Sequence, residues 1–310
     1  MKIIFFGSDD FAAVSLQRLL QEGHEVAACV TPPDRAKGRG LKITPTPVKE
    51  LAEKNSLPVL QPADVNDPAL ARRLKDCSAN LFVVIAYGKI LPEPLLNIPP
   101  MGAINIHASL LPKYRGAAPI AWALINGEAE TGVSLIRMNA RVDAGDIIAQ
   151  KKIKIKEKDN AVILRAKLRE LGAECLCQIL RAGKRSFRNL KPQNEEDVTL
   201  APRLTKDMGR ISWDKSAKEI HDLIRGLLPW PGAYTSFHDK RLKILDSEVA
   251  KEPYDCSIPG TVCGLTKQGF VVAAGQSALC VKKVHLESSK AMEANCFMTG
   301  HAIAEGQKFG

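Results

Sequence analysis

An amide, an imidazole and a carboxylate stand in two short stretches of the first half of this chain. Asn105-Ile-His107 closes an apolar run, and Asp143-Ala144-Gly145-Asp146 follows further along. Together such groups can polarise a carbonyl, move a proton and orient the group that moves it, without a metal or a covalent intermediate. The chemistry that this set favours is acyl transfer.

The amide and the imidazole belong to one predicted strand, residues 102–107. Side chains repeat on the same face of a strand every second residue, so Asn105 and His107 would both point at one substrate. An isolated Asn-x-His is more often a pair of satisfied polar side chains. What overturns that interpretation is the continuation Ser-Leu-Leu-Pro-x-x-Arg-Gly over residues 109–116.

On these motifs the chain resembles the folate-dependent formyltransferases, and within that family the enzymes that act on methionyl-tRNA. The likeness continues through residues 115–120 and 130–133, and more loosely over nearly the whole chain. It implies that 10-formyltetrahydrofolate donates a formyl group to the α-amino group of initiator methionyl-tRNA, which gives N-formylmethionyl-tRNA for translation initiation. The expected protein is a monomer without a metal or a membrane association.

The resemblance also assigns residues to the site. The family's catalytic trio falls on Asn105, His107 and Asp143. Its folate pocket falls on two segments, with the residues Ser109, Leu110, Leu111, Pro112, Tyr87, Gly88 and Leu91. One position departs from the pattern, because the family usually has Gly two residues before the catalytic Asp and this chain has Arg141. A Gly there suggests a left-handed or closely approached backbone, so Arg141 bears on the geometry of the loop.

Length and composition predict an ordinary globular protein. A chain of 310 residues exceeds the size at which one core usually stops growing, so two domains are expected. Its apolar stretches are far shorter than a membrane span. The eight cysteines show no metal-binding spacing, and in a long chain without a signal peptide they are expected to be reduced. We therefore expect a cytoplasmic protein.

The pattern of elements predicts an α/β fold, with a Rossmann-like domain over residues 1–182, a linker over 183–207 and a second domain over 208–310. The resemblance makes the first the formyltransferase domain and the last a tRNA-binding domain. Predicted strands are 2–6, 25–30, 81–87, 102–107, 131–138 and 147–155, and predicted helices are 11–20, 48–52, 67–74, 160–182 and 213–228. The first turn lacks the GxGxxG fingerprint, so dinucleotide binding is disfavoured. Short segments between turn signals after residue 233 suggest a small barrel, which the resemblance makes OB-like.

Positive charge is concentrated near the N-terminus. The net charge is +10, yet residues 208–310 hold 13 basic and 11 acidic residues, whereas residues 34–49 hold five basic residues against Asp34 alone. The Gly- and Pro-rich stretch that begins there predicts a long exposed loop. For charge alone a solvated loop without a ligand is the favoured interpretation. The resemblance adds contact with the tRNA acceptor arm through Arg35, Lys37, Arg39 and Lys42.

Other functions remain as alternatives. A formyltransferase for glycinamide ribonucleotide or an amino sugar nucleotide, or a formyl-folate hydrolase, would share the chemistry, but the basic loop and the C-terminal domain weigh against all three. A catalytically idle RNA-binding protein is disfavoured by the intact trio. Ser109 lacks the context of a nucleophile elbow. The remaining histidines have no motif around them and are expected to pack or lie on the surface: His24, His221, His238, His285 and His301.

Overall fold

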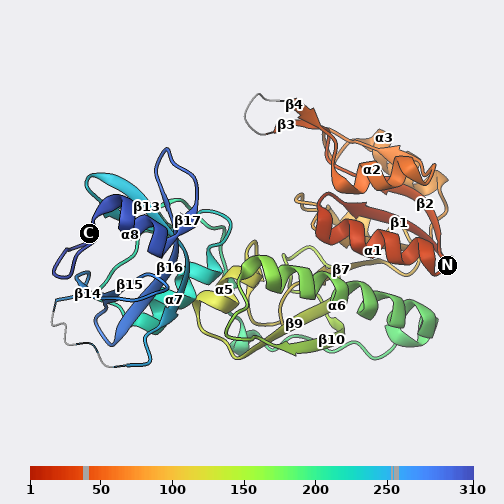
Figure 1. Cartoon of the computed structure of the whole chain (residues 1–310). Helices are drawn as coiled ribbons and strands as arrows, with labels where there is room; N and C mark the ends of the chain where they lie inside the picture. Colours follow the sequence, from red (N-terminus) through yellow and green to blue (C-terminus); the bar gives the residue numbers. More distant parts are fainter. Residues whose placement is uncertain (38–41, 253, 255–257) are drawn as a thin grey trace. The chain divides into compact units, whose positions relative to one another are not determined.

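The computed structural model describes residues 1–37, 42–252, 254 and 258–310 of the chain (Figure 1). These residues form two compact units, which are described separately. The first unit comprises Met1–Pro119, Glu130–Lys154 and Arg165–Ala201, and the second comprises Ile120–Ala129, Ile155–Leu164 and Pro202–Gly310. Two short pieces of the N-terminal half therefore pack with the C-terminal part of the chain. None of the helices in the described ranges combines the length and the apolar content needed to cross a bilayer.

The first unit is built on a seven-stranded sheet with the order β10-β9-β7-β6-β1-β2-β5. Five neighbouring strands are parallel, and β9 and β10 are antiparallel additions at one edge. The strands are β1 (Lys2–Gly7), β2 (Glu25–Val30), β5 (Val59–Leu60), β6 (Leu81–Ile85), β7 (Ala103–His107), β9 (Glu130–Arg137) and β10 (Ile147–Lys154). The predicted Rossmann-like α/β domain is confirmed.

Burial explains the strand sequences at the centre of this sheet. All five residues of β6 are buried, and so are Ile3 to Gly7 of β1, as expected for strands covered on both faces. The core on one side of the sheet includes Phe6, Phe82 and Tyr87, and the rings of the latter two lie 5.1 and 5.5 Å from that of Phe6. The parallel strands end at one edge, where open α/β sheets place their ligands.

Four of the helices begin at capping residues that the sequence offers. Asp9, Thr46, Asp67 and Ser216 each accept a hydrogen bond from a backbone N–H of the first turn. The helices are α1 (Asp10–Gln21), α2 (Pro47–Lys54), α3 (Pro68–Asp76), α4 (Glu93–Leu96), α5 (Pro119–Ile125), α6 (Ala161–Ala182), α7 (Ala217–Gly226) and α8 (Ala294–His301), and the 3₁₀ turns are Gly183–Phe187, Glu195–Asp197 and Asp207–Gly209. The predicted start at Trp213 was wrong, because a capping box at Ser216 and Glu219 begins the helix later.

The second unit contains an antiparallel sheet with the order β12-β13-β16-β15-β14, and β17 pairs with β16. Its strands are β12 (Ala233–Phe237), β13 (Lys240–Val249), β14 (Val262–Leu265), β15 (Phe270–Ala273), β16 (Ala278–Leu286) and β17 (Met292–Glu293). Rings from Phe237, Phe270, Phe297 and Phe309 pack in its core with centroids 5.4 to 5.8 Å apart. The prediction of a β-rich C-terminal domain, made as a small OB-like barrel, is confirmed to the extent that this domain is built on an antiparallel sheet.

Candidate active site

The amide and the imidazole lie at the carboxyl end of β7, as the strand alternation predicts. Asn105 pairs with Ile136 and His107 with Ser134 of β9, so both residues are set by the sheet register. The His107 side chain is 7% exposed, and Asn105 is half-buried. A sheet strand fixes the direction of both side chains more firmly than a loop would.

Asp143 approaches this pair from the loop between β9 and β10. Its Oδ2 lies 3.5 Å from Nδ1 of His107 and accepts a hydrogen bond of 2.9 Å from the backbone N–H of Gly116. Its Oδ1 lies 3.5 Å from Nδ2 of Asn105. The structure thus brings the three predicted catalytic side chains together around one carboxylate that is 14% exposed.

The other imidazole nitrogen is held by a backbone group. His107 Nε2 lies 2.8 Å from the carbonyl oxygen of Tyr114. A carbonyl oxygen only accepts, so Nε2 carries the hydrogen in this contact. Nδ1 is consequently the nitrogen that faces Asp143 and that can gain or lose a proton while the ring stays in place. The site therefore contains an amide donor beside a positioned acid or base.

The conformation of the loop between β9 and β10, here called the catalytic loop, explains its glycine and the place of Arg141. Asp143 itself has a left-handed φ of +51°, whereas Arg141 is absent from the described residues with positive φ. A Cβ at Gly145 would lie 1.7 Å from the carbonyl oxygen of Arg137, so only glycine fits there. The loop of this chain therefore needs no left-handed residue at position 141. Arg141 is instead an exposed side chain, 67% accessible, whose guanidinium lies 3.4 Å from Glu195.

The first predicted folate segment, residues 109–112, is a turn fixed by hydrogen bonds to neighbouring side chains and backbone groups. Ser109 is fully buried and donates to the carbonyl oxygen of Lys113 at 2.6 Å. The hydroxyl of Ser134 donates to the Ser109 carbonyl at 2.7 Å and accepts from the Leu111 N–H at 2.9 Å. Gln150 Nε2 donates to the Leu111 carbonyl at 2.8 Å. Leu110 and Pro112 are half-buried and Leu111 is buried, so the segment offers a ligand mainly its backbone and these partly exposed side chains.

The second predicted folate segment follows β6. Tyr87 and Leu91 are buried, and Gly88 is exposed with a left-handed φ of +79°. The Tyr87 hydroxyl is buried and has no hydrogen-bond partner among the described residues. Burial raises the pKa of this phenol to about 12, so it stays protonated and can donate. A buried donor without a partner is costly unless a ligand or water meets it.

Three of the four predicted tRNA-contacting residues, Arg35, Lys37 and Lys42, belong to a two-stranded ribbon. β3 (Arg35–Lys37) and β4 (Lys42–Thr44) pair only with each other, and in Figure 1 they extend beyond α2 and α3. Arg35 and Ile43 are exposed, the latter to 69%. Arg39 lies outside the described residues. The predicted exposed loop therefore contains short strands that the sequence pattern did not reveal.

The base of this ribbon is fixed by Asp34. Its carboxylate accepts from Lys49 Nζ at 2.6 Å and from Gln61 Nε2 at 2.8 Å. The hydrogen bond from Lys49 holds the pKa of Asp34 below its ordinary value, and the same contact raises the pKa of Lys49. Lys49 contributes to the basic count of residues 34–49, but its charge is engaged by Asp34.

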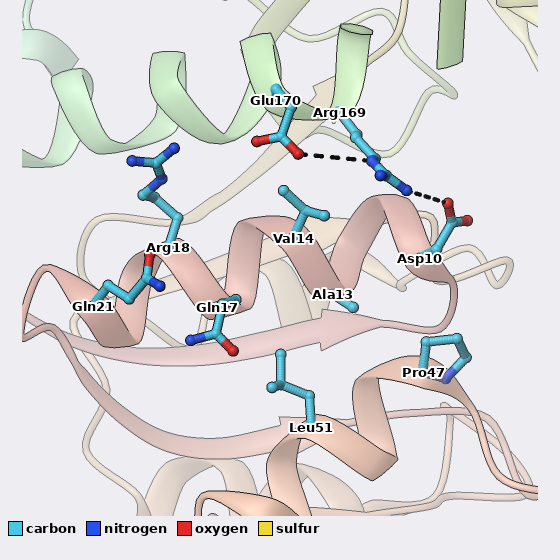
Figure 2. A pocket seen from close by; sticks show the side chains of 10 residues that line it. All are labelled: Asp10, Ala13, Val14, Gln17, Arg18, Gln21, Pro47, Leu51, Arg169 and Glu170. Atoms are coloured by element: carbon cyan, nitrogen blue, oxygen red, sulfur yellow. Dashed lines mark hydrogen bonds and ion pairs between the residues drawn. The ribbon is translucent and has the colours of Figure 1, made fainter. Parts of the chain in front are cut away.

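Two hollows of the first unit are lined by residues other than the trio. One of about 490 Å³ lies among α1, α2 and α6, where Figure 2 shows Arg169 between Asp10 and Glu170. The other, of about 320 Å³, is lined by Glu93, Leu96, Asn97, Met138, Asn139, Ala140 and Arg141, and so lies beside the catalytic loop. The described residues contain no cluster of three or more His, Cys, Asp or Glu side chains placed to hold a metal ion.

Several contacts of this site escape sequence reasoning. The Gly116 N–H and the Tyr114 carbonyl are backbone groups, which carry no residue signature. Gln193 donates to the carbonyl oxygens of Asp143 and Gly145 from a stretch predicted to be linker. Ser134, opposite His107 in β9, is a buried hydroxyl among apolar residues of the strand. A polar residue in such a run was the one sequence signal that could have pointed to these contacts.

Known proteins are similar to both parts of the chain. Residues 1–180 match the formyl transferase family, and residues 203–302 match the formyl transferase C-terminal domain. Over 307 residues the chain is 46% identical to a methionyl-tRNA formyltransferase from Caldanaerobacter subterraneus subsp. tengcongensis, with 99% of each chain covered. It is 43% identical over 310 residues to a methionyl-tRNA formyltransferase from Acetivibrio thermocellus, with 100% of each covered.

A solved structure gives the same fold at lower identity. WlaRD, a sugar 3N-formyl transferase crystallised in the presence of dTDP and 5-N-formyl-THF, superposes with a TM-score of 0.68 at 19% identity. The match covers 94% of this chain and 99% of that one. At this identity the likeness concerns the fold alone.

Proposed function

Because the chain belongs to the methionyl-tRNA formyltransferase family, we propose that it moves the formyl group of 10-formyltetrahydrofolate to the α-amino group of initiator methionyl-tRNA. The product is N-formylmethionyl-tRNA for translation initiation. The observation that carries this function is the meeting of Asn105, His107 and Asp143 in a chain related to these enzymes over its full length. Folate is a co-substrate, and no metal takes part in the proposed reaction.

Asn105 would act on the oxygen of the formyl group. When the neutral amine attacks the formyl carbon, negative charge grows on that oxygen. The amide has two N–H donors and needs no change of protonation to meet that charge. One such donor typically contributes ~10²–10³ in rate. Its weak 3.5 Å contact with Asp143 leaves it able to turn toward a substrate.

His107 would handle the protons. The attacking amine must lose a proton and N10 of the folate must gain one before it leaves. Nδ1 is the nitrogen with that freedom, because Nε2–H is held by the Tyr114 carbonyl. Asp143 stands 3.5 Å from Nδ1 and is itself held by the Gly116 N–H, so it orients the ring and supports the imidazolium.

The folate would lie between the two predicted segments. The buried hydroxyl of Tyr87, without a partner in the described structure, suits a polar edge of the pterin. Gly88 has open space around it, and the turn of residues 109–112 is fixed by Ser134 and Gln150. These features fit a flat heterocycle with donors and acceptors on its rim.

The tRNA would be recognised by charge outside this pocket. We assign Arg35, Lys37, Arg39 and Lys42 to the acceptor arm, and we assign residues 208–310 to additional tRNA contacts. The exposed Arg35 and the other basic residues in the sequence of this ribbon suit a phosphate backbone. We further propose that the enzyme acts as a monomer in the cytoplasm, and sedimentation as a larger species would contradict the monomer.

One assay separates this function from its rivals. The protein is incubated with 10-formyltetrahydrofolate, and release of tetrahydrofolate is followed with and without methionyl-tRNA. We expect release that requires methionyl-tRNA and matches the formyl group gained by the tRNA. Release without an acceptor would indicate a hydrolase. Binding of tRNA without any release would indicate an idle RNA-binding protein.

A further inference from the structure

The stretch of residues 191–201 runs along the catalytic site of the first unit. Lys191 and Ile147 exchange backbone hydrogen bonds of 2.8 and 2.9 Å. At the other end, β11 (Leu200–Ala201) pairs with β8 (Arg115–Gly116), the segment whose Gly116 N–H holds Asp143. This stretch therefore pairs with Ile147, just after the catalytic loop, and with the segment whose Gly116 N–H binds the Asp143 carboxylate.

Gln193, in the middle of that stretch, holds the catalytic loop directly. Its Nε2 donates to the carbonyl oxygens of Asp143 at 2.8 Å and of Gly145 at 2.7 Å. These two bonds bracket the turn in which Asp143 adopts a left-handed φ of +51°. A residue with a Cβ keeps that conformation only when its surroundings impose it. The side-chain amide of Gln193 supplies such a restraint, because it binds the backbone carbonyls of the turn.

The amide is itself fixed by an arginine. Arg115 is buried, and its Nε donates to Oε1 of Gln193 at 3.0 Å. Its two terminal nitrogens donate to the Glu195 carboxylate at 3.1 and 3.2 Å. The hydrogen bond from Arg115 keeps the pKa of Glu195 below its ordinary value, so Glu195 stays charged at neutral pH. Oε1 is thereby assigned to Arg115, and both N–H groups of Gln193 are aimed at the loop.

Glu195 also contacts the catalytic loop, through the side chain of Arg141. Its Oε1 lies 3.4 Å from the guanidinium of Arg141, two residues before Asp143. This contact exists because the chain carries Arg at the position where the resemblance leads one to expect Gly. Arg115, Gln193 and Glu195 thus connect to the catalytic loop at three places, two of them carbonyl oxygens and one a side chain.

We propose that Gln193 is a positioning residue for the formyl transfer reaction, which sets the catalytic loop so that the Asp143 carboxylate meets His107. It touches neither substrate in this assignment and acts through Asp143. Arg115 and Glu195 keep its amide in the required orientation. The inference rests on the proposed function and adds to it a residue outside the catalytic trio.

The test compares Gln193→Met with Gln178→Met in the full-length protein. Methionine preserves length but removes both donors, and Gln178 is a matched control because its amide donates to the exposed Glu174 of α6 at 3.1 Å, away from the catalytic loop. We expect kcat of Gln193→Met to fall by about 10- to 100-fold with KM for both substrates nearly unchanged, since a small displacement of a reacting group has effects of that size. The Gln178 variant should match the wild type.

A double-mutant cycle distinguishes positioning from a general structural role. If Gln193 acts through the carboxylate, Gln193→Met should cost little in an Asp143→Asn background, where that carboxylate is already replaced. Additive losses in the cycle, or a normal kcat for Gln193→Met, would overturn the inference. If that variant does not fold, Gln193→Glu gives the same decision, because it keeps the acceptor for Arg115 and lacks the donors. An inactive wild type would instead refute the proposed function.

Discussion

The catalytic cluster and the β3–β4 ribbon are held in the fold in different ways. Around Asp143, each polar group has a partner: the carboxylate meets Gly116 and His107, and the imidazole meets Tyr114. The ribbon pairs with no other strand of the described chain, and in Figure 1 it extends beyond α2 and α3. This difference fits our proposal, in which formyl transfer depends on fixed side chains and tRNA binding depends on the charge of the ribbon.

The contacts that restrain the catalytic loop and the β3–β4 ribbon differ in the same way. The catalytic loop is restrained along its length, by the Gly116 N–H, by Gln193 and by the close packing at Gly145. The ribbon is restrained at its base, where Asp34 binds Lys49 and Gln61. A change in the first region should therefore alter turnover, and a change in the second should alter the binding of tRNA.

The largest effect is expected in the catalytic cluster. His107→Ala should lower kcat by roughly 10²–10⁴, the usual contribution of a positioned acid or base. Asn105→Ala should lower it by ~10²–10³, because one donor to the developing oxyanion is removed. Single-turnover rates measure both effects, and the affinity for charged tRNA serves as the control. Near-normal turnover at saturating substrate in either variant would remove that residue from the reaction.

Asp143→Asn should have the next largest effect. The substitution keeps the size of the side chain but removes the charge that supports the imidazolium and replaces one acceptor with a donor. We expect kcat to fall by about 10²-fold, which is less than the greatest decrease expected at His107. Measuring kcat across the pH range checks the assignment, and an unaltered rate at every pH would count against it.

Neutralising the ribbon should act on binding alone. Changing Arg35, Lys37, Arg39 and Lys42 to glutamine should weaken tRNA binding and flatten its salt dependence, by roughly 0.7–0.9 in logarithmic slope for each phosphate that is no longer neutralised. Titration of tRNA binding against salt gives that slope. Folate affinity should stay constant. Lys54→Gln and Lys75→Gln, which change exposed lysines of α2 and α3, are the matched controls.

A smaller effect is expected from replacing the guanidinium of Arg39 with an ammonium group of the same charge. Arg39 stands between Gly38 and Gly40, and it can make a bidentate interaction that lysine cannot. Arg39→Lys should lower kcat/KM for methionyl-tRNA by roughly tenfold, the effect of removing about one hydrogen bond to a charged group. Full activity in this variant would mean that only net charge matters at this position.

The smallest effect is expected at the base of the ribbon. Asp34→Asn removes the charge partner of Lys49 but keeps an acceptor for Gln61. The pair is half-buried but lies near the surface, where one ion pair contributes little, so tRNA affinity should fall by at most about fivefold. A decrease as large as that of the neutralised ribbon would show that the ribbon needs a fixed orientation after all.

Much of the first unit could be predicted because its signals are local. β2 matches the predicted strand Glu25–Val30, and the cap at Asp9 marks the start of α1. The shared face of Asn105 and His107 followed from strand alternation, and the motif supplied Asp143. Such elements are set by neighbours in sequence, which a pattern can report.

What the sequence could not predict depends on contacts between distant residues. Residues 120–129 and 155–164 belong to the second unit: a Cβ at Gly226 would lie 2.7 Å from Ile125, and Arg225 donates to the Lys156 and Asp159 carbonyls. Removing residues 208–310 would uncover those pieces as well. Trp213 was taken for a helix residue, yet its indole donates to Thr235 at 3.1 Å and anchors the stretch before α7.

The most direct test of the division between chemistry and recognition is an acceptor swap. It measures kcat/KM for methionyl-tRNA and for a small amine acceptor derived from methionine. Both are measured in the wild type, in His107→Ala and in the neutralised ribbon variant. We predict that His107→Ala loses activity toward both acceptors by a similar factor, while the ribbon variant loses it toward the tRNA alone. An equal decrease toward both acceptors in the ribbon variant would show that the ribbon shapes the active site, and it would contradict the account.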